Sequence, residues 1–258
     1  MRLFFCISIT VLVLACQPTG NSSANEESYA TYQTPKHHSE TLTKVFEAHG
    51  GYEQWSKMKS LRYSKGEEST VTNLQNRKIR VESVEKTIGF DGNEVWITPD
   101  SVDASRARFY HNLYFYFYSM PFVVGDPGAI YEDVDEMNIN GKSYQGIKVS
   151  YNEGVGDASD DNYIIWADPE TSQMEWLMYT VTYRSGEPSD NYRLISYENW
   201  ETFNGLRLPT KIQWYHFDGD SVGGVRGEPV IFENIKMEEK FPPDSLFEMP
   251  EGAIIAPR

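Results

Sequence analysis

The stretch 109–122, FYHNLYFYFYSMPF, restricts what this chain can fold into more than any other part of the sequence. Eight of its fourteen residues are Phe or Tyr, so a helix here would lack a truly polar side. One helical face carries four apolar residues, which are Phe109, Leu113, Phe117 and Met120. The opposite face carries three tyrosines, which are Tyr110, Tyr114 and Tyr118. A helix that is apolar all round is buried on several sides or faces something other than water.

The predicted helix has a plausible beginning and end. Ser101 or Asp103 can cap its first turn, and Pro121 ends it because proline removes a backbone donor. Two interpretations stay open: a core helix on which a β-sheet folds, or a helix that also lines an apolar cavity suited to lipid. For the second interpretation, the candidate ligand-binding residues are Phe109, Tyr110, His111, Leu113, Tyr114, Phe117, Tyr118, Met120 and Phe122.

Residues 1–15 have the composition of an export signal. Arg2 supplies a positive charge, and the apolar run that follows is too short to remain as a membrane-spanning helix. The sequence Val13-Leu14-Ala15-Cys16 resembles a bacterial lipobox, in which the Cys thiol receives a diacylglycerol group. We therefore predict that Cys16 is lipidated; the alternative is an ordinary secretory signal that contains a Cys by chance.

Residues 16–38 are polar and poor in large apolar side chains, which is typical of a flexible tether. Gln17 stands where an Asp would resemble an inner-membrane retention signal. We therefore predict an outer-membrane lipoprotein that faces the periplasm and has the membrane as a partner through its anchor. Residues 39–258 are predicted to form a single β-rich domain.

Charge and cysteine content exclude several classes of function. The formal net charge of −15 repels nucleic acid and anionic lipid headgroups, so neither is an expected direct partner. The two cysteines are Cys6, inside the predicted signal, and Cys16. The predicted domain therefore has no cysteine for a disulfide, a thiolate metal site or a nucleophile.

The order of turns after residue 128 predicts an antiparallel meander. Asn140-Gly141, the stretch 168–172 and Asn204-Gly205 separate runs of strand-forming residues, with no intervening helical pattern. Upstream, 39–58 reads as a short helix pair, 61–69 and 78–85 as strands with a possible bulge, and 87–98 as a hairpin. The predicted class is α+β, with about ten strands in a curved sheet or half-open barrel around the aromatic helix.

Four stretches in this order resemble the LolA/LolB-like lipoprotein-carrier superfamily, specifically an uncharacterised lipoprotein branch. They are HGGYEQWSKMKSLRYS at 49–64, FDGNEVW at 90–96, YIIWADPETSQMEWLMYTVTY at 163–183 and NWETFNGLRLPTKIQWY at 199–215. The resemblance covers nearly all of 41–250 as a pattern of strands and turns. It implies an incomplete antiparallel barrel with helices closing its mouth and a hydrophobic cavity between. It carries no ligand-binding residue over to this chain.

Signals for catalysis or metal binding are weak. Of the five histidines, His37, His38, His49, His111 and His216, only His111 is expected to meet a cavity, and a lone histidine is more often a core residue. The sequence has no GxSxG, P-loop or GxGxxG motif. Asp157, Asp160 and Asp161, and separately Asp218 and Asp220, cluster in Gly-containing turns, but neither cluster matches a calcium loop. We predict no cofactor, no metal and no enzymatic activity.

Three functions remain open from the sequence. The first is binding or carrying a hydrophobic ligand, such as a lipid or a lipoprotein acyl chain, at the outer membrane. The second is a role in envelope assembly through an envelope protein partner. The third, hydrolysis of an apolar substrate, has only His111 to support it.

Overall fold

The computed structural model describes residues 38–151, 160–183, 187–219 and 221–257. The predictions for the signal, for Cys16 and for the tether up to His37 lie outside these residues. In the described part of the chain, no helix is long and apolar enough to cross a membrane.

The predicted N-terminal helix pair is present, as α1 (Glu40–Ala48) and α2 (Tyr52–Lys57). Ser39 caps α1 as predicted, because its Oγ accepts a hydrogen bond from Leu42 N at 3.2 Å. Gly50, between the helices, has a φ of +100°, and a Cβ atom there would lie 2.1 Å from the backbone oxygen of Gly205. The helix pair therefore packs tightly against a distant hairpin turn.

The first sheet, called sheet A here, is antiparallel and has seven strands in the described residues. Their spatial order is β14 (Glu233–Glu238), β1 (Ser60–Lys65), β2 (Glu68–Asn73), β3 (Ile79–Glu82), β4 (Thr87–Phe90), β5 (Val95–Thr98) and β15 (Ile254–Ile255). The η1 turn of 3₁₀-helix (Asp244–Leu246) lies between β14 and β15 in the chain.

The second sheet, sheet B, has eight antiparallel strands in the described residues. Seven follow the order β12 (Val222–Val225), β11 (Leu206–Phe217), β10 (Arg193–Phe203), β9 (Met174–Tyr179), β8 (Tyr163–Ala167), β7 (Lys142–Tyr151) and β6 (Ala129–Ile139). The eighth, β13 (Val230–Ile231), pairs with β11. Because β14 follows β13 directly and pairs with β1, the chain passes here from sheet B to sheet A.

The α+β class and the antiparallel pairing were predicted correctly, but the strand count was not. The stretch 61–69 is not one strand: it turns at Gly66-Glu67 and continues as β2. Val84 marks no bulge, because it lies 88% exposed in the turn between β3 and β4. The stretch 230–238 is divided between the two sheets, as β13 and β14.

The aromatic stretch forms three short helices rather than one: α3 (Ala107–Tyr110), α4 (Leu113–Tyr118) and α5 (Met120–Val123). Asp103 does not cap a helix but accepts hydrogen bonds from Ser105 N and Oγ, both at 2.9 Å. Pro121 does not end the helix either. It lies in the first turn of α5, where a missing N–H costs no intrahelical hydrogen bond.

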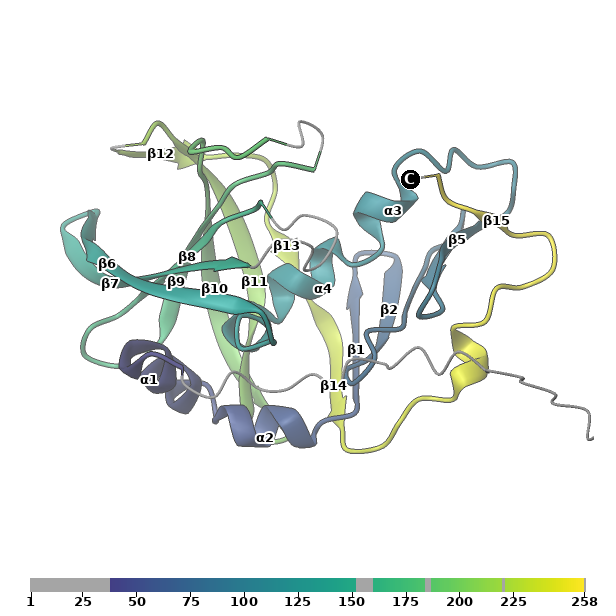
Figure 1. Cartoon of the computed structure of the whole chain (residues 1–258), viewed down its shortest axis with the longest axis horizontal. Coiled ribbons are helices and arrows are strands. Elements are labelled where there is room, and N and C mark those ends of the chain that lie inside the picture. Colours follow the sequence, from purple (N-terminus) through teal and green to yellow (C-terminus); the bar gives the residue numbers. More distant parts are fainter. Residues whose placement is uncertain (1–37, 152–159, 184–186, 220, 258) are drawn as a thin grey trace, which may run out of the picture. The chain divides into compact units, whose positions relative to one another are not determined.

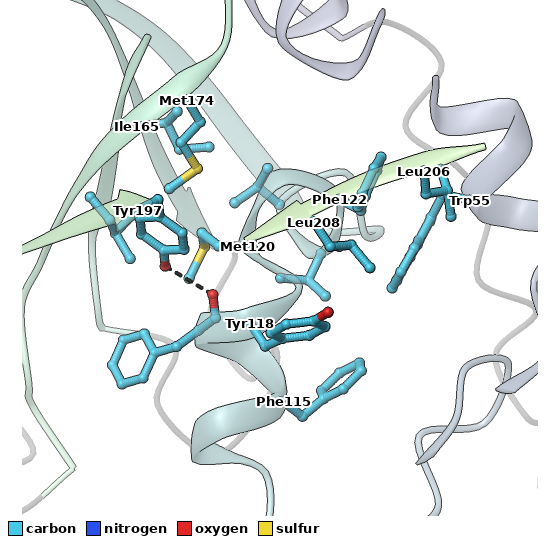
Figure 2. Packing of buried hydrophobic residues seen from close by; sticks show 14 of the residues in the cluster. Trp55, Phe115, Tyr118, Met120, Phe122, Ile165, Met174, Tyr197, Leu206 and Leu208 are labelled. Atoms are coloured by element: carbon cyan, nitrogen blue, oxygen red, sulfur yellow. Dashed lines mark hydrogen bonds between the residues drawn. The ribbon is translucent and has the colours of Figure 1, made fainter. Parts of the chain in front are cut away.

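The largest hydrophobic core contains residues of α4 and α5 together with residues of both sheets and of α1 and α2 (Figure 1). Phe122 stacks on Trp55 of α2 with ring centroids 4.8 Å apart. Tyr118 contacts Tyr63 of β1 and Phe232, which lies between β13 and β14. Figure 2 shows Met120 near Tyr197, whose hydroxyl donates to Phe117 O at 2.9 Å. The end of the aromatic stretch is therefore the centre around which the chain folds.

Candidate ligand cleft

A cleft of about 1240 Å³ follows the three aromatic helices. One side is formed by sheet A and its turns, including Ile79, Phe90 and Val95. The other side is formed by sheet B, including Tyr163 and Tyr179. Its walls are thus mostly apolar and aromatic, with hydroxyl groups toward sheet B.

Five of the nine candidate residues line this cleft: Phe109, His111, Leu113, Phe117 and Met120. Phe109 and Leu113 are half-buried, whereas Phe117 and Met120 are buried. The helical face predicted to be apolar is therefore the face that the cleft exposes. Whether these residues hold a ligand stays a prediction.

The other four candidates, Tyr110, Tyr114, Tyr118 and Phe122, lie away from the cleft lining. Tyr110 donates from its hydroxyl to both carboxylate oxygens of Glu68, at 2.9 and 2.7 Å. Lys65 Nζ lies over the Tyr114 ring at 4.4 Å from its centroid. Tyr118 and Phe122 are fully buried in the core.

One end of the cleft carries an ion pair that the sequence analysis did not anticipate. Arg77 pairs with Asp126, and both side chains are mostly buried. Arg77 also donates to Leu74 O at 2.5 Å, and its guanidinium carbon lies 5.5 Å from the centroid of Phe115. Burial raises the pKa of Asp126, while the guanidinium of Arg77 acts in the opposite direction. The pair joins the turn after β2 to the loop that follows α5.

A second arginine, Arg108, lies in α3 and pairs with Glu94 at 3.0 Å. His111 Nδ1 lies 2.5 Å from Arg108 O, and its ring lies 5.6 Å from that of Phe90. The histidine is 4% exposed and lines the cleft as expected. These contacts fix α3 against the β4–β5 hairpin.

The sheet B side of the cleft has its own polar group. Trp214 Nε1 donates to the hydroxyl oxygen of Tyr179 at 2.8 Å. Burial raises the pKa of Tyr179, while the Trp214 indole and the Arg193 guanidinium lower it. Asp161 also lines the cleft and accepts from Thr182 N at 2.6 Å and from Thr182 Oγ1 at 2.8 Å.

The acidic clusters give no metal site in the described part of the chain, where no group of three or more His, Cys, Asp or Glu side chains could hold an ion. Asp157 and Asp220 lie outside the described residues. Asp218 accepts from Ser221 N at 2.8 Å and from Ser221 Oγ at 3.0 Å, as a turn residue does. Asp161 is bound by Thr182, as described above.

Among the remaining histidines, His49 is fully buried and His216 is exposed. His38 packs against Phe46 and Tyr52 with ring centroids 4.9 and 5.1 Å away. His37 lies outside the described residues. None of these three described side chains lines the cleft.

Residues 64–220 match a family of unknown function, DUF6503. The chain belongs to this family. The matched residues include β2 to β11, the three aromatic helices and most of the cleft lining. The family description assigns no activity, and no curated protein matches the chain.

Solved structures similar to this chain include three of low sequence identity. The LolA superfamily protein NE2245 from Nitrosomonas europaea is 14% identical, with a TM-score of 0.46 over 74% of this chain and 87% of that one. A DUF1329 family protein from Desulfovibrio piger is 9% identical, with a TM-score of 0.46 over 81% and 95%. A domain assigned to outer membrane lipoprotein sorting from Vibrio parahaemolyticus is 5% identical, with a TM-score of 0.42 over 80% and 97%. The first of these proteins belongs to the LolA superfamily, which the sequence also resembles, but TM-scores below 0.5 and these identities transfer neither a role nor a functional residue to this chain.

Proposed function

We propose that this chain binds an apolar or amphiphilic ligand, such as a lipid or an acyl chain, in the cleft along α3 to α5. The observation that carries the proposal is the cleft itself, about 1240 Å³ in volume and lined by apolar residues from three separate parts of the fold. Ligand sites are concave and mostly apolar, with a few placed polar groups, and commonly measure about 300–1,000 Å³. The cleft has this character and room for a long chain.

Half-buried side chains in the wall support this proposal. Phe109 and Leu113 keep part of their apolar surface accessible within the cleft, next to the buried Phe117. An apolar ligand would cover this surface and gain roughly 25 cal/mol for each Å² of apolar area removed from water. The same surface would otherwise remain in contact with water.

The sequence of the leader adds a location to the proposal. We infer that Cys16, in the lipobox-like sequence, is lipidated and anchors the chain to the outer membrane, where it acts as a periplasmic carrier rather than an enzyme. Cys16→Ser should then release the protein from the membrane fraction. Membrane association that persists in this variant would contradict the anchor.

Native mass spectrometry of the full chain tests ligand binding, because a bound lipid adds its mass to that of the protein. Organic extraction then allows the lipid to be identified. The expected result is a co-purifying or added long-chain molecule in a one-to-one complex. The variant Leu113→Trp adds bulk inside the cleft and should lower occupancy at least about tenfold. Val84→Trp adds the same kind of bulk at an exposed turn and should leave occupancy unchanged.

Absence of any complex with long-chain ligands, in a chain that is folded, would overturn the proposal. Equal occupancy in the two tryptophan variants would place the ligand elsewhere. A reproducible envelope protein partner together with an unoccupied cleft would instead favour a role in assembly.

A further inference from the structure

The polar end of the cleft places a tyrosine hydroxyl and an arginine guanidinium side by side. The hydroxyl oxygen of Tyr179 already accepts a hydrogen bond from Trp214 Nε1 at 2.8 Å. The Arg193 guanidinium also forms a hydrogen bond with this hydroxyl group. Tyr179 is only 5% exposed and lines the cleft, so a donor is held in a dry place facing the ligand space.

Arg193 stands beside this hydroxyl. Arg193 and Tyr179 are directly opposite each other in the β9–β10 pairing, so both side chains project from the same face of sheet B. Arg193 also lines the cleft and is exposed, and its charge acts on both Tyr179 and Asp161. An exposed guanidinium keeps its charge without a large desolvation cost and can approach a ligand at the rim.

Two carboxylates line the cleft, and each is also engaged by another partner in the described residues. The Oδ1 atom of Asp161 accepts both hydrogen bonds from Thr182, and the charge of Arg193 acts to lower the pKa of Asp161. Asp126 is paired with Arg77. The chain as a whole carries a net charge of −15, so an arginine in this cleft is a local feature and not a result of a basic composition.

We propose that the ligand is an anionic amphiphile, with a carboxylate or similar acidic head bound by Tyr179 and Arg193 and an apolar chain lying along Phe117, Leu113 and Phe109. This inference rests on the proposed function of the cleft. Two donors, one of them charged, match the lone pairs of a carboxylate, and the Trp214 indole fixes the hydroxyl in place. The aromatic walls that follow from this point suit a hydrocarbon chain.

A headgroup series on the full chain tests the inference. Hexadecanoic acid and hexadecanol, which share a hydrocarbon chain and differ in charge, compete with the neutral fluorescent probe N-phenylnaphthylamine. The acid should bind about tenfold more tightly than the alcohol, since hydrogen bonds to charged groups are among the stronger ones. Arg193→Gln should remove this preference and leave the affinity for the alcohol unchanged. Tyr179→Phe, which keeps the ring, should reduce the preference in part.

Arg62→Gln is the matched control, because it removes the same charge from sheet A, away from the cleft lining. It should keep the full preference for the acid. A preference lost equally in Arg62→Gln and Arg193→Gln would overturn the inference, because net charge would then explain it. Equal binding of acid and alcohol by the unaltered chain would also overturn it while leaving the proposed function intact. Failure of both ligands to displace the probe would overturn the proposed function itself.

Discussion

The two halves of the aromatic stretch have similar compositions but different surroundings. From Phe109 to Tyr114, every side chain except His111 is half-buried, and Phe109 and Leu113 face the cleft. From Phe117 to Val124, every residue is buried, in contact with both sheets or with α1 and α2. The first half is a partly accessible wall of the cleft, and the second half belongs to the core, although Phe117 and Met120 also reach the cleft lining.

The difference shows how a fold can keep an apolar cleft open. A side chain that is fully enclosed by protein atoms loses many dispersion contacts when it is removed, whereas a cleft residue has fewer to lose. The buried half therefore carries the stability, and the half-buried half is free to contact a ligand. The break between α4 and α5 at Ser119 lies within the buried half.

The largest expected effect concerns the buried half. Phe122→Ala should lower the free energy of unfolding by about 3–5 kcal/mol, because Phe122 is 0% exposed and stacks on Trp55. Urea unfolding followed by tryptophan fluorescence measures this change. Phe109→Ala, at a half-buried position of the other half, is the matched comparison and should cost clearly less. Equal losses at the two positions would break the distinction between core and wall.

The second effect is a pH dependence of stability that comes from a buried histidine packed against the buried half. His49 is 0% exposed, its ring lies 6.4 Å from that of Phe122, and burial lowers its pKa to about 4. Between about 6.5 and about 4, the unfolded chain binds a proton that the folded chain does not, so stability decreases as pH falls through this range. The expected loss from this group is about 3 kcal/mol.

The comparison of unaltered chain and His49→Leu isolates this contribution. The difference in unfolding free energy between them should shrink by about 3 kcal/mol from pH 7 to pH 4. A profile that is parallel for the unaltered chain and His49→Leu would contradict the buried, neutral state of His49.

The smallest effect on stability is expected in the cleft wall. Leu113→Ala should lower the free energy of unfolding by about 1 kcal/mol or less, because this side chain is only half-buried and lines the cleft. The affinity of this variant for hexadecanol should nevertheless fall by about threefold to tenfold, since apolar contact area with the hydrocarbon chain of the ligand is lost. A large loss of stability without a change in affinity would assign Leu113 to the core.

Local turn chemistry was predictable from the sequence, and long-range pairing was not. Asn140-Gly141 and Asn204-Gly205 adopt the positive φ angles that such hairpin turns need, and the strands on either side lie close to where the sequence placed them. At the 168–172 turn, Asp168 Oδ1 accepts from Glu170 N at 2.8 Å and Thr171 N at 2.7 Å. These features depend on neighbouring residues, so a single sequence reveals them.

The full lining of the cleft could not be predicted from the spacing of apolar residues along the sequence. The helical spacing separated an apolar face from a tyrosine face, but residues of both faces were proposed as ligand candidates, and the stretch was treated as one straight helix. Arg77, Tyr179 and Arg193 lie far from it in the sequence and reach the cleft through strand order and register. Their positions follow from the pairing of whole sheets, which no local pattern of residue types specifies.

The pairing of β1 with β14 limits the order in which the strands of sheet A can assemble during folding. Ser60 lies opposite Glu238, so one edge of sheet A stays unpaired until almost the entire chain is available. Contacts between such distant residues form slowly, and open strand edges can pair with other chains in the meantime. This edge of sheet A is therefore expected to stay open until residues 233–238 are available to pair with β1.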